Sequence, residues 1–279
     1  MSSRHEDGRL PGAAGVDLYW QAWLPETELR ALVVIAHGAS EHSSRYAHVA
    51  ERLVAAGYVV YAVDHRGHGR SEGKRAQLDR LDKVVADLRA FIESAASRHP
   101  GAPVYLLGHS MGGAISIAYA VRHEETLAGL VLSAPVADPN AAGAVTRGLS
   151  RVLSAVAPDL GVYEVDASLV SRDPEVVRSY EGDPLNHHGK LPARTVAELT
   201  AAVQRFPTQV PGLRLPLLVM HGSADGLVPE AGSHLVYERA GSEDKTLEIW
   251  DGLYHEILNE PERDRVLDLI VTWLDERSG

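Results

Sequence analysis

Short apolar runs recur along the chain and alternate with segments of helical periodicity. The runs are almost entirely apolar rather than alternating, which is typical of strands that are buried on both faces. They lie at 32–36, 59–63, 104–107, 127–132, 217–220 and 247–250. Between them, apolar residues repeat at intervals of three and four over 81–92 and 266–274, and 112–121 is small and apolar. This alternation predicts an α/β fold with a mostly parallel sheet and helices on both faces.

The beginning and the end of the chain differ from the buried runs. Apolar and polar residues alternate better over 16–23, which predicts an antiparallel edge strand. Residues 1–7 are polar, and we expect a frayed tail there. Near the other end, Pro261 follows Asn259 and Glu260, a pattern that favours the start of a last helix.

The segment 138–207 interrupts the alternation of strands and helices, because it contains no clear buried strand and several prolines divide it. It holds two amphipathic stripes, Val145–Leu149–Val152–Leu153–Val156 and Val196–Leu199–Val203–Phe206. We interpret 138–207 as a helical cap inserted after the sixth strand, over one end of a core formed by 1–137 and 208–279. Most of the stripe residues are expected to pack inside this cap. The alternative is that some of them line a substrate pocket or contact a membrane, with Leu149, Leu153, Val156 and His187 as the candidates.

Composition narrows the range of partners. The 279 residues are 45% hydrophobic and 23% charged, ordinary values for a globular protein, and their formal net charge is −11. An acidic chain binds nucleic acid and anionic lipid poorly, since both interactions depend on cationic side chains. Any contact with a lipid surface is therefore expected to be peripheral and apolar.

Cysteine is absent, which excludes disulfides, thiolate metal sites and a cysteine nucleophile. No apolar run approaches the roughly 20 residues that a membrane span needs, and the polar start MSSRHEDG has no signal-peptide pattern. From these features we expect a cytoplasmic protein.

The strongest chemical motif follows the run 104–107. There the sequence Gly108-His109-Ser110-Met111-Gly112 comes between a strand and a helix, the setting of the G-x-S-x-G nucleophile turn. Such a turn strains its central residue and needs small residues two positions before and after it, where backbones pass closely. It would present the Ser110 hydroxyl at a helix N-terminus, so we predict that Ser110 is a nucleophile.

A serine nucleophile needs a base, and the base needs an orienting carboxylate. Asp225 lies in a turn just after the run 217–220, and His255 lies in the loop after 247–250. Both fall at the sheet edge that also holds Ser110. We predict Asp225 as the acid and His255 as the base, with Asp251 and Glu256 as competing partners for His255. His234 falls within a predicted helix over 230–239, away from this edge.

Acyl transfer also needs two donors for the developing oxyanion. The backbone N–H of Met111, directly after the nucleophile, is expected to be one of them. The second is expected to be the N–H of Ala39, in the loop after the run 32–36. His37 in this loop is interpreted as a structural residue that bonds to loop backbone.

Two histidine pairs could suggest a metal. His65 and His68 lie in a Gly-rich stretch, and His187 and His188 lie in the predicted cap. Neither pair has a third ligand at a convincing spacing, so we expect no metal site and no cofactor.

Taken together, these stretches resemble the monoacylglycerol lipases, the lysophospholipase-like group of the α/β-hydrolase superfamily, from about residue 15 to the C-terminus. The matching stretches are HGASEHSSRY (37–46), DHRGHGRSEGKR (64–75), GHSMGG (108–113), LSAP (132–135), HGSADGLVP (221–229) and GLYHEILNEPER (252–263). The cap sequences SRDPEVV (171–177) and DPLNHHG (183–189) are similar to the bacterial branch.

The resemblance implies an α/β-hydrolase fold and hydrolysis of a glycerol monoester of a fatty acid under a mobile lid. It assigns the nucleophile to Ser110, the acid to Asp225, the base to His255, and the oxyanion donors to Ala39 and Met111. The family commonly has glycine after the oxyanion residue, where this chain has Ser40. A positive φ at this position would strain a serine.

Other activities of the same fold stay open, because the triad does not choose the leaving group. They are those of a broader carboxylesterase, a lysophospholipase, a thioesterase or an aminopeptidase. A non-catalytic ligand receptor on a hydrolase scaffold is a more remote alternative. Dehalogenases and epoxide hydrolases use an aspartate nucleophile, which Ser110 argues against.

Overall fold

The structure is a computed structural model that describes residues 4–26, 29–141 and 143–278. Within these residues, the centre of the molecule is an eight-stranded sheet of order β1-β2-β4-β3-β5-β6-β9-β10. The strands are β1 (Arg4–Pro11), β2 (Asp17–Leu24), β3 (Leu32–Ala36), β4 (Val59–Val63), β5 (Val104–His109), β6 (Gly129–Ser133), β9 (Leu217–Gly222) and β10 (Lys245–Trp250). The pairs from β4 to β10 are parallel, and the two pairs that involve β2 are antiparallel. The predicted mostly parallel sheet is confirmed.

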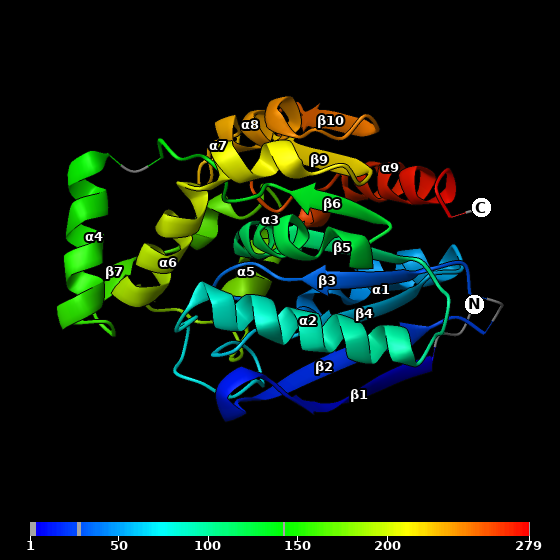
Figure 1. Cartoon of the computed structure of the whole chain (residues 1–279), viewed down its shortest axis with the longest axis horizontal. Helices are drawn as coiled ribbons and strands as arrows, with labels where there is room; N and C mark the ends of the chain where they lie inside the picture. Colours follow the sequence, from blue (N-terminus) through cyan, green and yellow to red (C-terminus); the bar gives the residue numbers. More distant parts are fainter. Residues whose placement is uncertain (1–3, 27–28, 142, 279) are drawn as a thin grey trace.

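Helices cover both faces of the sheet (Figure 1). They are α1 (Ala47–Ala55), α2 (Leu81–Ser97), α3 (Met111–His123), α8 (Ala231–Arg239) and α9 (Arg263–Asp275), and short 3₁₀ turns lie at Ala13–Gly15, Ser43–Tyr46, Glu124–Thr126, Ala167–Leu169, Val210–Gly212 and Ile257–Asn259. The helices α2, α3 and α8 pack on one face of the sheet, and α1 and α9 pack on the other. Alternate residues of a strand point to opposite faces, so Leu32 and Val34 join one core while Val33 and Ile35 join the other. This explains why the sequence pattern is apolar at every position.

The predicted tail over residues 1–7 is wrong for its described part. Residues Arg4–Pro11 form β1, which pairs along its whole length with β2. Consequently β2, predicted as the edge strand, lies between β1 and β4. The polar sequence of β1 hid it, because its side chains are mostly exposed or half-buried and its order comes from ladder hydrogen bonds with β2.

The segment 138–207 lies to one side of the sheet (Figure 1). Its helices are α4 (Ala144–Val156), α5 (Pro174–Gly182) and α6 (Ala193–Val203), and the short α7 (Phe206–Gln209) leads back to the sheet. It also contains a small antiparallel pair, β7 (Gly161–Tyr163) with β8 (Leu191–Pro192). The sequence did not predict this pair, because β7 is only three residues long and exposed.

The chain order within the sheet defines where a site can form. Strand β3 lies between β4 and β5, so the connections from β3 and from β4 run in opposite directions across the sheet. In open α/β sheets, a crevice forms at such a reversal, outside the carboxyl ends of the strands. Among the described residues, no helix is long and apolar enough to cross a membrane.

Candidate active site

Ser110 occupies the sharp turn between β5 and α3. Its φ of 54° and ψ of −117° are strained for a residue with a side chain. A Cβ added to Gly112 would lie 2.0 Å from the carbonyl oxygen of Ala36, and one added to Gly108 would lie 2.4 Å from Ser116 Oγ. Glycine is therefore required at both positions, as the sequence motif predicted.

Ser110, His255 and Asp225 come together at the carboxyl edge of the sheet. His255 Nε2 lies 2.9 Å from Ser110 Oγ, and His255 Nδ1 lies 2.7 Å from Asp225 Oδ2. The other oxygen, Asp225 Oδ1, accepts hydrogen bonds from the backbone N–H groups of Leu227 and Val228. The geometry is that of a serine nucleophile, its base and an orienting carboxylate.

Close packing holds the two loops that carry Asp225 and His255. A Cβ on Gly222 would lie 2.3 Å from the carbonyl oxygen of Leu253, so the loop after β10 rests directly on the end of β9. Ala224 N donates to the carbonyl oxygen of Leu253 at 3.0 Å and joins the same loops. These contacts make the distance between Asp225 and His255 a property of the sheet edge rather than of free loops.

The competing partners for His255 are engaged elsewhere. Glu256 forms a bidentate pair with Arg45, and Asp251 accepts a hydrogen bond from Ser223. His234 lies in α8, as predicted. The sequence alone could not exclude Glu256 as the partner of His255, because Glu256 is the next residue and its own partner, Arg45, is distant in the chain.

The loop after β3 brings Ala39 next to the nucleophile. Both Ala39 and Met111 line the cavity in front of Ser110. Within the described residues, neither backbone N–H makes a hydrogen bond, so both remain available to an oxyanion. Ser40 has a φ of 64°, so the strain expected for a positive φ at this position is present.

A buried ionic cluster that the sequence did not predict holds the loop that carries Ala39. Glu41 Oε1 accepts from the Gly38 N–H at 2.6 Å, and its Oε2 pairs with Arg45, which also binds Glu256. Burial alone would raise the pKa of Glu256, but the Arg45 guanidinium outweighs it and holds this pKa at about 2. Because Glu256 follows His255, the cluster connects the loop of the oxyanion donor to the loop of the base.

The histidines of the two glycine-rich loops are structural. His37 Nε2 accepts from the His65 backbone N–H at 2.9 Å, and its Nδ1 lies 2.7 Å from the carbonyl oxygen of Gly38, so its predicted structural role is confirmed. Burial lowers the pKa of His37 and of His68 to about 3, which keeps both rings neutral. No group of three or more potential metal ligands occurs in the part of the chain that the structure describes.

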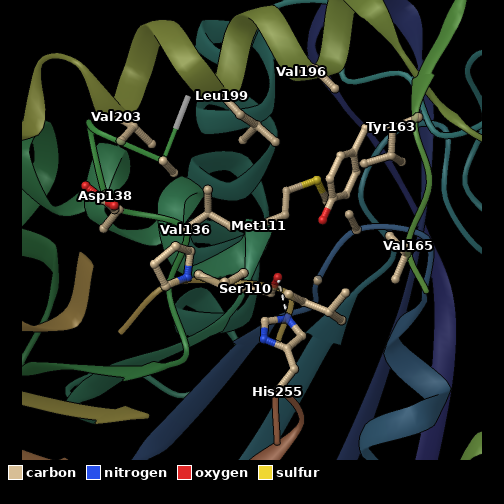
Figure 2. A pocket seen from close by; sticks show the side chains of 18 of the residues that line it. Ser110, Met111, Val136, Asp138, Tyr163, Val165, Val196, Leu199, Val203 and His255 are labelled. Atoms are coloured by element: carbon tan, nitrogen blue, oxygen red, sulfur yellow. Dashed lines mark hydrogen bonds between the residues drawn. The ribbon is translucent and has the colours of Figure 1, made fainter. Parts of the chain in front are cut away.

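A cavity of about 480 Å³ opens in front of Ser110. Figure 2 shows Val196, Leu199 and Val203 of α6 pointing down towards the nucleophile, with Tyr163 and Val165 at one side. Further apolar side chains complete the lining: Val136, Val170, Leu191, Leu227 and Val228. Ser110 and His255 lie at its floor, so the site can take an apolar ligand next to the reactive hydroxyl.

The predicted pocket residues of the first stripe, and His187 with them, need correction. Leu149, Leu153, Val156 and His187 all lie outside the cavity lining, which α6 forms instead. Helix α4 packs against α6 on the side away from the sheet (Figure 1), so α6 separates it from the cavity. The side chain of Val145, from the same stripe, lies outside the described residues. His187 instead donates its backbone N–H to the Ser40 carbonyl at 2.9 Å.

A second histidine approaches the carboxylate of Asp225. His221, at the end of β9, places Nε2 3.0 Å from Asp225 Oδ2. His221 belongs to the stretch HGSADGLVP (221–229), but the sequence did not indicate a role for it. The one sequence feature that could have indicated this contact is that His221 precedes Asp225 by four residues, at the end of the strand that Asp225 follows.

The comparisons with known proteins agree with this site. A family model described as "Serine aminopeptidase, S33" matches residues 27–262. The chain is 46% identical over 275 residues to a monoacylglycerol lipase of Mycolicibacterium smegmatis, covering 98% of each chain. It is 38% identical over 274 residues to the human monoglyceride lipase, covering 97% of this chain and 90% of the relative.

A solved structure gives the same result. The crystal structure of the Paleococcus ferrophilus monoacylglycerol lipase superposes with a TM-score of 0.83 at 29% identity. The superposition covers 99% of this chain and 100% of that one. The similarity thus includes both the sheet and the segment 138–207.

Proposed function

The chain belongs to the α/β-hydrolase family described as serine aminopeptidase, S33, and within it to the monoacylglycerol lipases, and we propose that it hydrolyses monoacylglycerols through an acyl-enzyme on Ser110. One observation carries the proposal. The hydrogen-bonded series Ser110–His255–Asp225 lies at the floor of an apolar cavity. An uncharged glycerol ester with one acyl chain suits both the apolar lining of the cavity and the negative net charge of the protein.

The proposed mechanism assigns a role to each group. His255, oriented by Asp225, takes the proton of Ser110 as its Oγ attacks the ester carbonyl. The N–H groups of Ala39 and Met111 stabilise the tetrahedral oxyanion. His255 then protonates glycerol as it leaves, and a water molecule activated by His255 hydrolyses the acyl-enzyme. No metal or organic cofactor enters these steps, so EDTA is expected to leave the activity unchanged.

The acyl chain is proposed to lie along α6. Val196, Leu199 and Val203 face the nucleophile in one row, and burying methylene groups against them contributes about 0.8 kcal/mol each. Because this row and the residues that face it line one cavity of about 480 Å³, the arrangement favours a substrate with one acyl chain.

The test compares substrates at matched chain length. Hydrolysis of mono-, di- and trioleoylglycerol, oleoyl lysophosphatidylcholine and oleoyl-CoA is measured by release of oleate. We expect the highest kcat/KM for the monoacylglycerol. A clear preference for any other substrate would reject the proposed substrate and leave the serine hydrolase chemistry intact.

The Ser110→Ala variant tests the chemistry itself. It should lower turnover by about 10³-fold or more and should lose labelling by a fluorophosphonate probe. Activity near that of the wild type in this variant would reject Ser110 as the nucleophile.

We also propose that residues 138–207 act as a cap that contacts lipid through α4. The exposed fractions of Leu149, Val152 and Val156 are 54%, 58% and 73%, and these residues lie on one face of the helix. Ser150 and Ser154, on another face, are buried. An apolar stripe turned to solvent, with small polar residues turned inwards, is the reverse of an ordinary surface helix. It supports peripheral contact with a membrane or micelle that presents the substrate.

A further inference from the structure

Four nitrogen atoms, two from the backbone and two from imidazole rings, approach the carboxylate of Asp225. Two backbone N–H groups reach Oδ1, while His255 Nδ1 lies 2.7 Å from Oδ2. His221 Nε2 lies 3.0 Å from the same Oδ2. A carboxylate has about four acceptor positions, so this group is fully satisfied. The same oxygen of Asp225, Oδ2, is therefore approached by two imidazole rings, those of His255 and His221.

The surroundings of His221 fix its proton. Nε2 also lies 3.0 Å from the carbonyl oxygen of Val228, so both of its neighbours are acceptors and Nε2 must carry hydrogen. Nδ1 lies 2.7 Å from the hydroxyl of Ser233, on α8, which can donate to it. The ring is thus held between a strand and a helix, and its one Nε2 hydrogen is shared between the Val228 carbonyl oxygen, to which it is hydrogen-bonded, and Asp225 Oδ2.

His221 and the side chains that it contacts are shielded from solvent. The His221 side chain is fully buried, and Ser233 and Asp225 are buried with it. His221 does not line the cavity, so it cannot contact a substrate there. An imidazole at such a position can affect the reaction only through the groups that it contacts, of which Asp225 belongs to the triad.

We propose that His221 is a positioning residue, which donates from Nε2 to Asp225 Oδ2 and limits how strongly this oxygen draws the proton of His255. This inference rests on the proposed roles of Ser110, His255 and Asp225. The second donor keeps Oδ2 in line with His255 Nδ1. It also withdraws negative charge from that oxygen, so the imidazolium of His255 is stabilised enough to form and still gives its proton to the leaving alcohol.

The electrostatics of Asp225 are consistent with this role. Burial would raise the pKa of Asp225, but the hydrogen bonds from His221 and then His255 outweigh it and hold the pKa well below its usual range. The other titratable groups influenced by the Asp225 charge are His109, whose ring lies 4.7 Å from that of His255, and Tyr163 of β7. Glu256 also acts on His109 but is paired with Arg45. Within the described residues, neither His109 nor Tyr163 is hydrogen-bonded to Asp225, so the second imidazole at this carboxylate is that of His221.

The experiment uses two substitutions that separate the two ring nitrogens. A glutamine amide can reach the position of Nε2, so His221→Gln keeps a donor for Asp225. An asparagine amide reaches only the position of Nδ1, so His221→Asn keeps a partner for Ser233 and removes the donor to Asp225. The full chain is assayed with p-nitrophenyl butyrate and with monooleoylglycerol from pH 5 to 9, and folding is checked by circular dichroism.

For His221→Asn we expect kcat to fall about tenfold with KM unchanged. The acid limb of the kcat/KM profile should move to higher pH by about half a unit or more, because the less satisfied carboxylate holds the proton on His255 more strongly. His221→Gln should recover most of the lost kcat and return the acid limb towards the wild-type position. His234→Asn, a histidine in α8 outside the site, serves as the matched control and should behave as the wild type.

Two results would overturn the inference. One is a His221→Asn profile identical to that of the wild type, and the other is an equal loss in the Gln and Asn variants with no shift of the acid limb. If His221→Asn does not fold, Ser233→Ala replaces it. Without the hydroxyl that holds Nδ1 the ring is free to turn away from Asp225, so a smaller shift in the same direction is expected, and no shift counts against the proposal.

The outcome is separable from that of the proposed function. If the wild type hydrolyses p-nitrophenyl butyrate but not monooleoylglycerol, the substrate proposal fails while the comparison of His221 variants remains valid. If Ser110→Ala retains activity and the wild type is not labelled by a fluorophosphonate, the triad itself fails, and the role of His221 fails with it.

Discussion

Ser40 follows the proposed oxyanion donor Ala39 and has a left-handed backbone, with a φ of 64°. For a residue with a Cβ, this conformation costs roughly 1–2 kcal/mol. The serine is kept there by the structure around it, since its carbonyl oxygen accepts from His187 N and the neighbouring Gly38 N–H is held by Glu41. The strain is therefore stored next to the group that must meet the oxyanion.

Replacing Ser40 with glycine is expected to relieve this strain. Glycine adopts positive φ freely but loses more chain entropy on folding, so the net gain should be about 0.5–1 kcal/mol, or roughly 2 °C in Tm. Thermal unfolding followed by circular dichroism measures it. Ser40→Ala is the control, because alanine keeps the Cβ. An equal gain in both variants would show that strain is not the cause.

Gly38 is expected to tolerate no side chain. A Cβ there would lie 2.7 Å from Glu41 Oε1 and 3.2 Å from Ser110 Cβ. Since Glu41 is buried and held by Arg45 and Tyr46, the loop must move instead, and the Ala39 N–H moves with it.

We predict that Gly38→Ala lowers kcat by about 10²-fold, the effect of losing one oxyanion donor. Steady-state kinetics with monooleoylglycerol check this. Gly212→Ala is the matched control, because an added Cβ meets nothing within 4 Å there. A Gly38→Ala enzyme with the turnover of this control would contradict the proposed position of the donor.

Helix α4 and strand β1 show how differently two elements obtain their order. Strand β1 is polar and is ordered by its ladder with β2, while the guanidinium of Arg98 stacks on Trp20 of β2. Helix α4 has a clear apolar stripe, which a single sequence suggests should be buried, yet its stripe faces solvent and its serines face inwards. In both elements the partner surface decides what the residues do, and the pattern alone cannot identify this partner.

The element-scale prediction concerns α4. The Leu149→Asp/Val152→Asp variant should lose at least about tenfold in binding to phosphatidylcholine vesicles, because two exposed apolar side chains would become charged. Co-sedimentation measures this binding, which should depend little on salt since the contact is apolar. Hydrolysis of soluble p-nitrophenyl butyrate should change little.

A control distinguishes the stripe from added charge. Ser94→Asp/Ser97→Asp adds the same two charges to exposed positions of α2, outside the proposed cap. If it loses vesicle binding as strongly as the α4 variant, net charge rather than the α4 stripe governs binding. Vesicle binding that is unchanged in the α4 variant would reject the proposed contact.

At the scale of the whole molecule, buried neutral histidines couple stability to pH. Burial lowers the pKa of His37, His68 and His109 to about 3, and it holds the pKa of His65 well below its usual value. In the unfolded chain each would titrate near pH 6.5. The unfolded state therefore binds more protons below this pH, and the stability present above pH 6.5 is lost as the pH falls towards 3.

Below pH 6.5, each such histidine is expected to lower the free energy of unfolding by up to about 1.4 kcal/mol for each pH unit. Urea unfolding at pH 8, 6.5, 5.5 and 5 measures the slope above the range in which the depressed carboxylates titrate. His68→Asn keeps a hydrogen-bonding group at the position of Nδ1 and should reduce the slope by about one histidine. Equal slopes in the variant and the wild type would mean that His68 is protonated in the native state.

Much of the fold and of the candidate site follows from local sequence. Strands β3 and β4 have the bounds predicted, because buried parallel strands are apolar on both faces. Ser110 was found because its turn requires Gly108 and Gly112, and Asp225 and His255 because each follows a strand end. The contacts of Glu41, Arg45 and Glu256 were not predicted, since they join loops more than 200 residues apart in the sequence, and no local pattern records such a pairing.

The sequence by itself determined the class of the sheet, the three residues Ser110, Asp225 and His255 that meet at its edge, and the strain at Ser40. Each of these depends on short-range geometry, in which a particular residue type is required at a fixed position. Only the tertiary structure decided that α6 rather than α4 lines the cavity, that residues 4–11 form a strand, and that His221 shares the carboxylate of Asp225. These features depend on which surfaces meet, and that is set by the packing of the whole chain rather than by any one segment.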